Sequence, residues 1–471
     1  MTPGEKNGSD NMKISRRVGL LDTLEFFRRH RSLSPAQLIS ISFAATIFIG
    51  AMLLMLPMAH SGTTPITLVD ALFTSTSAVC VTGLIVVDTG TAFSDFGKWV
   101  ILLLIQAGGL GIMTLGTILA LASGRRIGFQ ERMRLQAQIN SLHVGGIVNL
   151  IRRIVVFVVV TELVGAFLLF LRFSQIEGAG RGLFYAIFHS ISAFNNAGFA
   201  FYADSISSFV SDPIINIPIM MLIILGGLGF SVVFNGLGHM RRGRLAPLTL
   251  HSKIVLTTTF FLILSGFILI ALFEWTNVNT LGNLSVGGKL MAALFQSISP
   301  RTAGFNSVDY AAMRGPTQML TVLLMFIGGS PGSTAGGIKT VTFFLLIGSA
   351  WTISKGEDVV NAFGRRIEFE LVVKAGVIAL FGVMISGAAV TVLAMTDPQF
   401  ELFALVFEAI SAIGTVGLSL GITPELSTPG KLIIIILMYL GRLGALTFAL
   451  ALVENRKART ITYPAENVVL G

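Results

Sequence analysis

The stretch FEAISAIGTVGL at residues 407–418 decides the fold, because three related stretches precede it at a nearly constant interval. These copies are FTSTSAVCVTGL at 73–84, FHSISAFNNAGF at 188–199 and LFQSISPRTAGF at 294–305. The copies align on one glycine each, at intervals of 115, 106 and 113 residues: Gly83, Gly198, Gly304 and Gly417. In the third copy the phenylalanine lies one residue nearer its glycine. Four copies indicate an internal repeat rather than chance similarity in a glycine-rich chain.

Each copy lies between two long apolar segments. A helix needs roughly 20 residues to cross a hydrocarbon core about 30 Å thick. Eight segments are long enough: 36–56, 99–122, 154–172, 214–238, 254–273, 319–351, 375–395 and 432–453. Hydrophobic residues make up 53% of the chain and charged residues only 12%, about half the roughly 25% of soluble domains. The sequence therefore predicts an all-α polytopic membrane protein with eight transmembrane helices and four re-entrant pore helices.

The basic charge follows the membrane topology. If the N-terminus is inside, 24 of the 33 lysines and arginines fall in cytoplasmic segments and six in outer segments. This excess on one side predicts that both termini are cytoplasmic. It also explains the net charge of +9 without a nucleic-acid partner. The first 35 residues are too long and too charged for the start of a signal peptide, so we expect them to be retained.

The repeats define the expected domain organisation. Each unit is a span, a re-entrant segment and a second span, so each begins on the same side of the membrane. Parallel copies can surround one central pore, whereas the inverted repeats of many secondary transporters need an odd number of crossings. The expected parts are a basic N-terminal segment at 1–35, repeats at 36–126, 127–244, 245–356 and 357–457, and a tail at 458–471.

The residues before each aligned glycine suit a short half-helix, at 68–78, 181–193, 288–299 and 400–412. The C-terminal end of such a helix carries about half a negative charge, which favours a cation near the membrane centre. The glycines allow positive φ, so that successive carbonyls can face one line. Rings of carbonyl oxygens select potassium by replacing its hydration water. Thr415-Val416-Gly417 matches the first three residues of a potassium-channel filter.

We therefore expect a selectivity filter that coordinates potassium through the backbone carbonyls next to the four aligned glycines. The predicted filter residues are Val79, Cys80, Val81, Thr82, Gly83, Asn195, Asn196, Ala197, Gly198, Thr302, Ala303, Gly304, Gly414, Thr415, Val416 and Gly417. Cys80 is the only cysteine, which excludes an intramolecular disulfide and a Cys-rich metal site.

At these segments the chain resembles the Trk/Ktr/HKT superfamily of potassium transporters, and specifically the membrane subunit of bacterial Ktr-type systems. The resemblance covers roughly residues 36–455 and rests also on GGSPGSTAGGIKT at 328–340 and LGRLG at 440–444. It implies potassium uptake across the bacterial inner membrane, often stimulated by sodium. It further implies a homodimer with one pore per subunit, regulated by a separate cytosolic ring of nucleotide-binding RCK subunits.

The sixth apolar segment, 319–351, is too long for one straight span, since its 33 residues would extend about 50 Å. Its central glycines and Pro331 should break the helix. The break is either a passive kink or, as the resemblance implies, a gating loop below the filter. A phosphate-binding P-loop is excluded because Ile338 separates Gly337 from Lys339. The predicted gate residues are Gly328, Gly329, Ser330, Pro331, Gly332, Ser333, Thr334, Ala335, Gly336, Gly337, Lys339 and Arg442.

Several polar residues lie within apolar sequence. A charge there costs at least about 2.5–3.5 kcal/mol, so Arg442 should face protein or water. It either pairs with a buried carboxylate or, as the resemblance implies, faces the pore. Arg301 should point behind its filter segment, and a pair with Glu408 is one option. For Glu162 and His189 we expect structural partners rather than proton transfer.

These features favour potassium uptake by a protein that is not an enzyme, since the few histidines and carboxylates are scattered along the sequence. The alternative is a secondary transporter that moves a small solute by alternating access. Such a transporter would favour inverted repeats and a site of polar side chains near the membrane centre.

Overall fold

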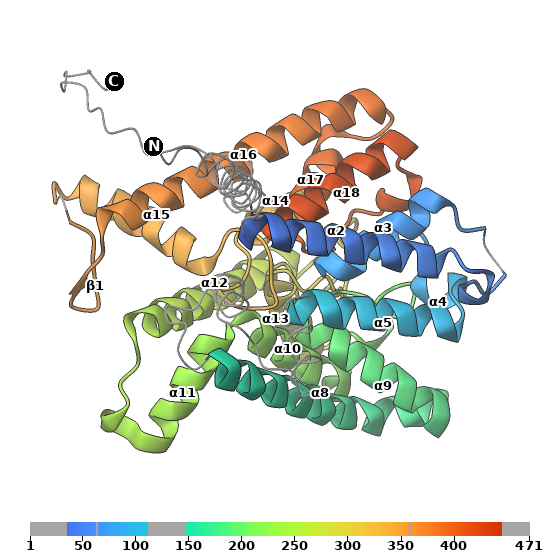
Figure 1. Cartoon of the computed structure of the whole chain (residues 1–471), viewed down its shortest axis with the longest axis horizontal. Helices are drawn as coiled ribbons and strands as arrows, with labels where there is room; N and C mark the ends of the chain where they lie inside the picture. Colours follow the sequence, from blue (N-terminus) through green and yellow to red (C-terminus); the bar gives the residue numbers. More distant parts are fainter. Residues whose placement is uncertain (1–34, 63–64, 112–146, 358, 445–471) are drawn as a thin grey trace, which may run out of the picture.

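Long and short helices alternate along the chain in the computed structural model, which describes residues 35–62, 65–111, 147–357 and 359–444 (Figure 1). The first repeat comprises α2 (Pro35–Leu54), η1 (Pro57–Ala59), α3 (Leu68–Cys80), α4 (Thr89–Ala92) and α5 (Asp95–Leu110). The second comprises α8 (Ile147–Glu177), α9 (Ala179–Phe194), η2 (Ser207–Phe209), α10 (Pro213–Gly227), α11 (Phe230–Arg242) and η3 (Gly243–Leu245).

The third and fourth repeats have the same order, with one small hairpin between them. The third contains α12 (Leu250–Glu274), α13 (Val286–Ile298), α14 (Gly315–Phe326) and α15 (Thr340–Ser354). The antiparallel strands β1 (Asn361–Ala362) and β2 (Arg365–Arg366) follow. The fourth contains α16 (Phe369–Thr396), α17 (Leu402–Gly414), η4 (Thr423–Glu425) and α18 (Thr428–Leu443). The predicted half-helices correspond to α3, α9, α13 and α17, whose ends lie within two residues of the expected positions.

The first helix of each repeat is long and apolar enough to cross a membrane: α2, α8, α12 and α16. The second helix of each repeat is shorter, bent or broken within the described residues. Helices α5 and α18 end next to undescribed residues, at 112–146 and 445–471. The expected break in the sixth segment is confirmed, because α14 ends at Phe326 and α15 begins at Thr340.

The prediction of one continuous span at 214–238 is wrong. The chain bends by 103° between α10 and α11. Gly229 lies in the bend with a φ of +88°, a conformation that favours glycine. A Cβ atom at this position would lie only 2.6 Å from the Pro331 carbonyl oxygen of the third repeat. The apolar residues continue past the bend, so hydropathy alone hides it.

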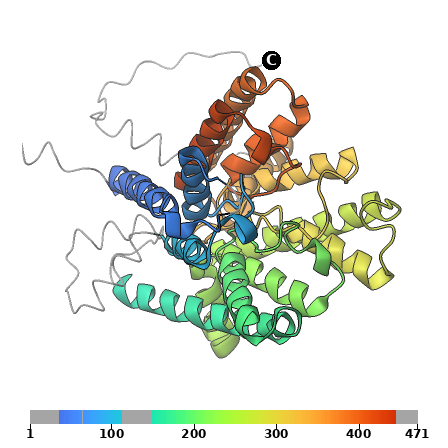
Figure 2. The ribbon, with the colours of Figure 1, turned by 90° about the vertical axis from the view of Figure 1, so that its right-hand side faces the viewer.

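The four repeats close into a ring. The second helix of each repeat packs against the short helix of the next: α5 on α9, α10 on α13, α14 on α17, and α18 on α3. Figure 2 shows the repeats in sequence order around a centre, where the segments after the short helices meet. This cyclic order brings residues more than 300 positions apart in the sequence into one site.

Serine hydroxyls attach three of the short helices to the first helix of their own repeat. The hydroxyls of Ser75, Ser190 and Ser297 each donate a hydrogen bond of 2.7 Å, to the carbonyls of Ile47, Glu162 and Ile263. Opposite each serine stands a glycine whose added Cβ would collide with the hydroxyl: Gly50, Gly165 and Gly266. These glycines therefore permit the close approach that positions the short helices.

Candidate cation pathway

Each of the four aligned glycines packs against the backbone of the next segment, so the four segments form a closed ring. Their φ angles are 92° at Gly83, 69° at Gly198, 74° at Gly304 and 91° at Gly417. A Cβ on Gly83 would lie 2.6 Å from the Ala197 oxygen of the next segment. The same approach links Gly198 to the Ala303 oxygen, Gly304 to the Val416 oxygen, and Gly417 to the Thr82 oxygen. Both the backbone conformation and the contact therefore require glycine at this position.

A second residue with positive φ stands two positions before each glycine. These residues are Val81 (56°), Asn196 (57°), Thr302 (75°) and Thr415 (48°). Left-handed backbone is costly for β-branched residues and persists only where the surrounding structure enforces it. The amides of Thr82, Ala197 and Val416 donate to serine carbonyls five residues earlier, each at 2.8 Å, whereas Ala303 donates to Ser299, four residues earlier, at 2.9 Å. The third segment is thus one residue shorter, as its displaced phenylalanine indicates.

Serine hydroxyls at the ends of the short helices bond to the segments that follow them. The hydroxyls of Ser77 and Ser411 accept from the amides of Gly83 and Gly417, at 3.0 and 3.1 Å. The Ser192 hydroxyl instead donates to the Phe199 carbonyl at 2.8 Å, and Ser299 donates in the same way to Phe305. These four hydroxyls fix the segments in place, a role that the sequence did not reveal.

Other polar atoms at the ring have no protein partner within the described part of the chain. They are Thr82 Oγ1, Thr302 Oγ1, Thr415 Oγ1 and Asn196 Oδ1, and all four atoms are buried. Among the predicted filter residues, Val79, Cys80 and Gly414 lie in the last turns of α3 and α17, and Asn195 caps α9. The backbone that faces the neighbouring segments is therefore that of the two or three residues ending at each aligned glycine.

Arg301 and Glu408 do not pair, so the proposed ion pair is wrong. Arg301 is buried, and one of its guanidinium nitrogens donates to Thr259 Oγ1 on α12 at 3.4 Å. The two carboxylate oxygens of Glu408 accept from the hydroxyls of Thr423 at 2.5 Å and Ser419 at 2.8 Å. Glu408 thus finds its partners in the loop after its own filter segment, which the sequence could not place.

Glu162 has the structural partners that we expected. Its carboxylate accepts from Asn195 Nδ2 at 3.0 Å and from Gln106 Nε2 at 3.3 Å. Asn195 also donates to Gln106 Oε1 at 2.9 Å. This buried cluster joins the first repeat to the end of α9. Gln106 was missed from the sequence, where its one signal is its place two residues before Gly108.

His189 is likewise a structural residue. Its Nδ1 lies 2.7 Å from the Tyr185 carbonyl oxygen, and its Nε2 lies 3.4 Å from the Phe201 amide. The ring is fully buried beside Phe173.

The break in the third repeat forms a compact loop, residues 327–339, which we call the broken-helix loop. Its two ends pair, since the Gly328 amide donates to the Ile338 carbonyl at 2.9 Å. The loop also contacts the bend of the second repeat: Ser330 N donates to Gly227 O at 3.0 Å, and Phe230 N donates to Gly332 O at 3.1 Å. The two broken helices therefore stabilise each other.

Two cations hold carbonyls of the broken-helix loop. Lys339 Nζ donates to the carbonyls of Ala335 at 2.6 Å and Gly336 at 3.3 Å. Arg442 on α18 donates to the carbonyls of Thr334 and Gly108. Arg442 thus bonds to backbone carbonyls, and the alternative of a buried carboxylate partner is wrong for the described residues. Both cations line a cavity of about 270 Å³ between the loop, α16 and α18.

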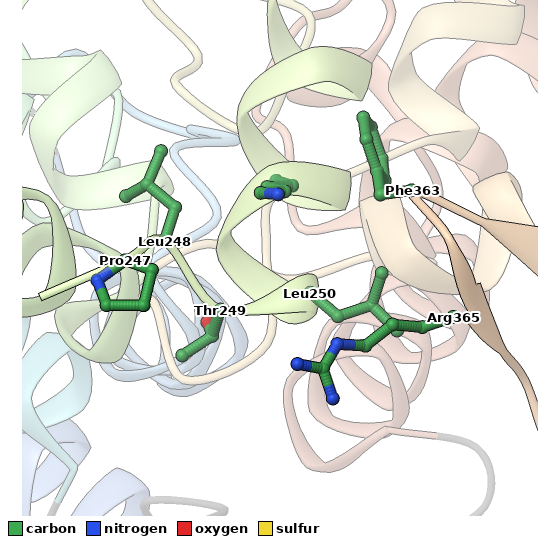
Figure 3. A pocket seen from close by; sticks show the side chains of 7 residues that line it. Pro247, Leu248, Thr249, Leu250, Phe363 and Arg365 are labelled. Carbon is green, nitrogen blue, oxygen red and sulfur yellow. The ribbon is translucent and has the colours of Figure 1, made fainter. Parts of the chain in front are cut away.

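A second cavity, of about 360 Å³, lies away from the ring (Figure 3). Phe363 and Arg365 of the hairpin face the segment that leads into α12. Its lining contains none of the predicted filter or gate residues.

Comparisons with known proteins agree with this architecture. Residues 23–460 match the TrkH family model, described as a cation transport protein. The Ktr system potassium uptake protein B of Bacillus subtilis is 42% identical, over 93% of this chain and 97% of the relative. The protein of the same name from Vibrio alginolyticus is 41% identical, over 92% and 94%. The potassium/sodium uptake protein NtpJ of Enterococcus hirae is 38% identical, over 94% and 99%.

A solved structure is similar over most of its length. The potassium transporter TrkH from Vibrio parahaemolyticus superposes with a TM-score of 0.71, covering 90% of this chain and 86% of that chain at 20% identity. This likeness establishes a shared, mainly helical fold.

Proposed function

Since the chain belongs to the TrkH family of cation transport proteins, we propose that it takes up potassium ions across the cytoplasmic membrane of a bacterium. The observation that carries this proposal is the closed ring of four glycines, each in contact with a carbonyl of the next segment. Backbone carbonyl oxygens that replace hydration water suit a dehydrated monovalent cation.

In this proposal the predicted filter residues surround the potassium path, with carbonyls next to Gly83, Gly198, Gly304 and Gly417 as ligands. Two features support it. The C-terminal ends of α3, α9, α13 and α17 lead directly into the ring, and each contributes about half a negative charge. The buried, unpartnered oxygens of Thr82, Thr302, Thr415 and Asn196 add polar atoms around the same ring.

We further propose eight transmembrane spans, of which the fourth is bent between α10 and α11 and the sixth is broken between α14 and α15, with four pore helices, cytoplasmic termini and the repeat boundaries given by the sequence. The cyclic packing of the four repeats supports a common orientation. Alternating access, the other interpretation of the sequence, would favour inverted repeats. The boundaries at residues 126 and 457 lie outside the described residues.

The broken-helix loop is the proposed gate. Arg442 on α18 places a positive charge beside the loop, and both Arg442 and Lys339, at the end of the loop itself, bond to its carbonyls. A fixed positive charge on the path repels potassium, so the docked loop opposes conduction both sterically and electrostatically. Opening requires the loop to leave its contacts with α18 and with the bend of the second repeat.

The names of the relatives support our proposals about partner subunits and coupling ions. Two relatives are named as parts of a Ktr system, which supports a complex with further subunits. We propose a homodimer regulated by a cytosolic nucleotide-binding RCK ring. The name of the third relative includes sodium, which supports a sodium effect on potassium uptake here.

Rubidium uptake in a bacterium that lacks its own potassium transporters tests the function. The wild-type chain should restore uptake, and potassium should compete better than sodium. Gly304→Ser should lose this preference, because a Cβ would lie 2.6 Å from the Val416 oxygen. Gly287→Ser is the matched control, since nothing lies within 4 Å of its added Cβ. Equal preference in wild type and Gly304→Ser would overturn the filter assignment.

A further inference from the structure

Thr334 connects the broken-helix loop to the second filter segment. Its side chain is fully buried, at 0% exposure. Its hydroxyl donates to the carbonyl of Phe194, the last residue of α9, at 3.2 Å. The same oxygen accepts from Asn196 Nδ2 at 3.0 Å. The Thr334 hydroxyl thus bonds both to the end of α9 and to Asn196, the residue with positive φ two positions before Gly198.

The backbone of Thr334 extends this junction to two other helices. Its amide donates to the Gly226 carbonyl on α10 at 3.2 Å. Its carbonyl accepts from Arg442 on α18. By contrast, the Ser333 hydroxyl donates to Ser330 within the loop, and Lys339 bonds to the loop's own carbonyls. Thr334 is therefore where the loop meets the second and fourth repeats at once.

A short chain of contacts leads from Thr334 into the ring. Asn196 is followed by Ala197, whose carbonyl oxygen packs against Gly83 of the first segment. On its other side, the loop presses on the fourth segment, because an added Cβ on Gly336 would collide with Thr415 Oγ1. Two of the four filter segments thus rest directly on the loop.

We propose that Thr334 is a positioning residue that couples the filter to the broken-helix loop, so that loop release and loss of potassium preference occur together. The inference rests on the proposed function and deepens it. When the loop leaves, Asn196 loses the acceptor of its amide and the second segment loses its support. Coupling between two sites is reciprocal, so a change at Asn196 must also change the loop.

Because the coupling is reciprocal, the test changes each of the two residues, Thr334 and Asn196, in turn. Thr334→Val keeps the shape but removes both hydrogen bonds of the hydroxyl, and Asn196→Gly removes the same bond from the filter side while tolerating positive φ. Both variants should raise the initial rate of rubidium uptake and lower the potassium-over-sodium preference, each by about fivefold or more. Thr334→Ser retains the hydroxyl and should restore both properties.

Thr391→Val is the matched control, because the hydroxyl of this exposed threonine on α16 donates to the Gly387 carbonyl of its own helix and to no other group in the described part of the chain. It should leave rate and preference unchanged. If Thr334→Val raises the rate of rubidium uptake but keeps the potassium-over-sodium preference, the coupling is overturned and the loop gates independently of the filter. Unchanged rate and preference would also overturn it. If Thr334→Val does not yield folded protein, Asn196→Gly carries the same prediction.

A second measurement separates this inference from the proposed function. Thermal unfolding of the purified single and double variants at positions 196 and 334 should be non-additive, since the residues share one hydrogen bond. Additive effects would contradict the coupling. Failure of the wild-type chain to take up potassium would contradict the proposed function, while the unfolding cycle would still decide whether the two residues are coupled.

Discussion

The ring formed by the four filter segments and the broken-helix loop are held in place by different kinds of contact. Each filter segment is bonded to its own repeat through a backbone bond to a serine, and its glycine packs against a carbonyl of the next segment. The loop occurs in the third repeat only and, besides bonds between its own residues, is held by other repeats: it donates two backbone bonds to α10 and accepts bonds from Arg442 on α18 and from Asn196 of the second filter segment. We therefore expect the ring to be the fixed part of the pathway and the loop to be the part that moves.

The largest expected effect comes from breaking the ring itself. Gly417→Ala places a Cβ against the Thr82 carbonyl and imposes a φ of 91° on a residue with a side chain. Overpacking costs about 1–3 kcal/mol, and the backbone conformation adds to that cost. We expect rubidium uptake to be abolished and the unfolding temperature of the purified protein to fall. Gly287→Ala, the control, should leave both near wild type; normal uptake by Gly417→Ala would contradict a rigid ring.

The next effect comes from releasing the loop. Arg442→Ala removes the bond to the Thr334 carbonyl and one positive charge. We expect the initial rate of rubidium uptake to rise about tenfold, which corresponds to about 1.4 kcal/mol. The rate should be measured at matched amounts of membrane protein. Unchanged or lower uptake by a well-expressed variant would show that the loop does not limit flow.

A smaller effect, on thermal stability, is expected at the buried cluster of Glu162, Asn195 and Gln106. Glu162→Ala removes the acceptor of the Gln106 amide and one of the three acceptors of the Asn195 amide, which costs about 1–3 kcal/mol. The thermal unfolding midpoint of the purified protein should fall accordingly, and Glu162→Gln should fall less because it keeps an acceptor. Glu370→Ala, on the exposed face of α16, serves as the control. Equal stability of Glu162→Ala and wild type would exclude a structural role for the cluster.

The smallest expected effect is on the pH dependence of stability. It concerns Asp397, which follows α16 and accepts hydrogen bonds from Ser427, the N-cap of α18. Burial opposes its charge, but bonds from the Ser427 amide at 2.6 Å, the Thr396 hydroxyl and the Ser427 hydroxyl outweigh it, so the pKa of Asp397 lies below the usual 3.8. A lowered folded-state pKa stabilises the protein above about pH 4, and this stability is lost as the pH falls through the folded-state pKa.

Unfolding temperatures measured from pH 6 downward should therefore converge for wild type and Asp397→Asn at the acid end. A constant difference across this range would contradict the assigned ionisation.

The sequence predicts the repeated parts of this molecule better than the unique parts. Four aligned stretches place the short helices within two residues, and the glycines and Pro331 predict the break before Thr340. The bend at Gly229 was missed because apolar residues continue through it. The partners of Arg301 and Glu408 were wrong because they depend on loops and helices that only the fold brings together. The junction at Thr334 joins three repeats, so no local pattern reveals it.

Anomalous scattering from crystals soaked in rubidium or thallium tests the central claim most directly. The four glycine segments should enclose anomalous density on the axis between the carbonyls of Thr82, Ala197, Ala303 and Val416. Gly304→Ser should lose or weaken this density, and Gly287→Ser should keep it. A wild-type protein that takes up rubidium but shows no density within the ring would contradict the account.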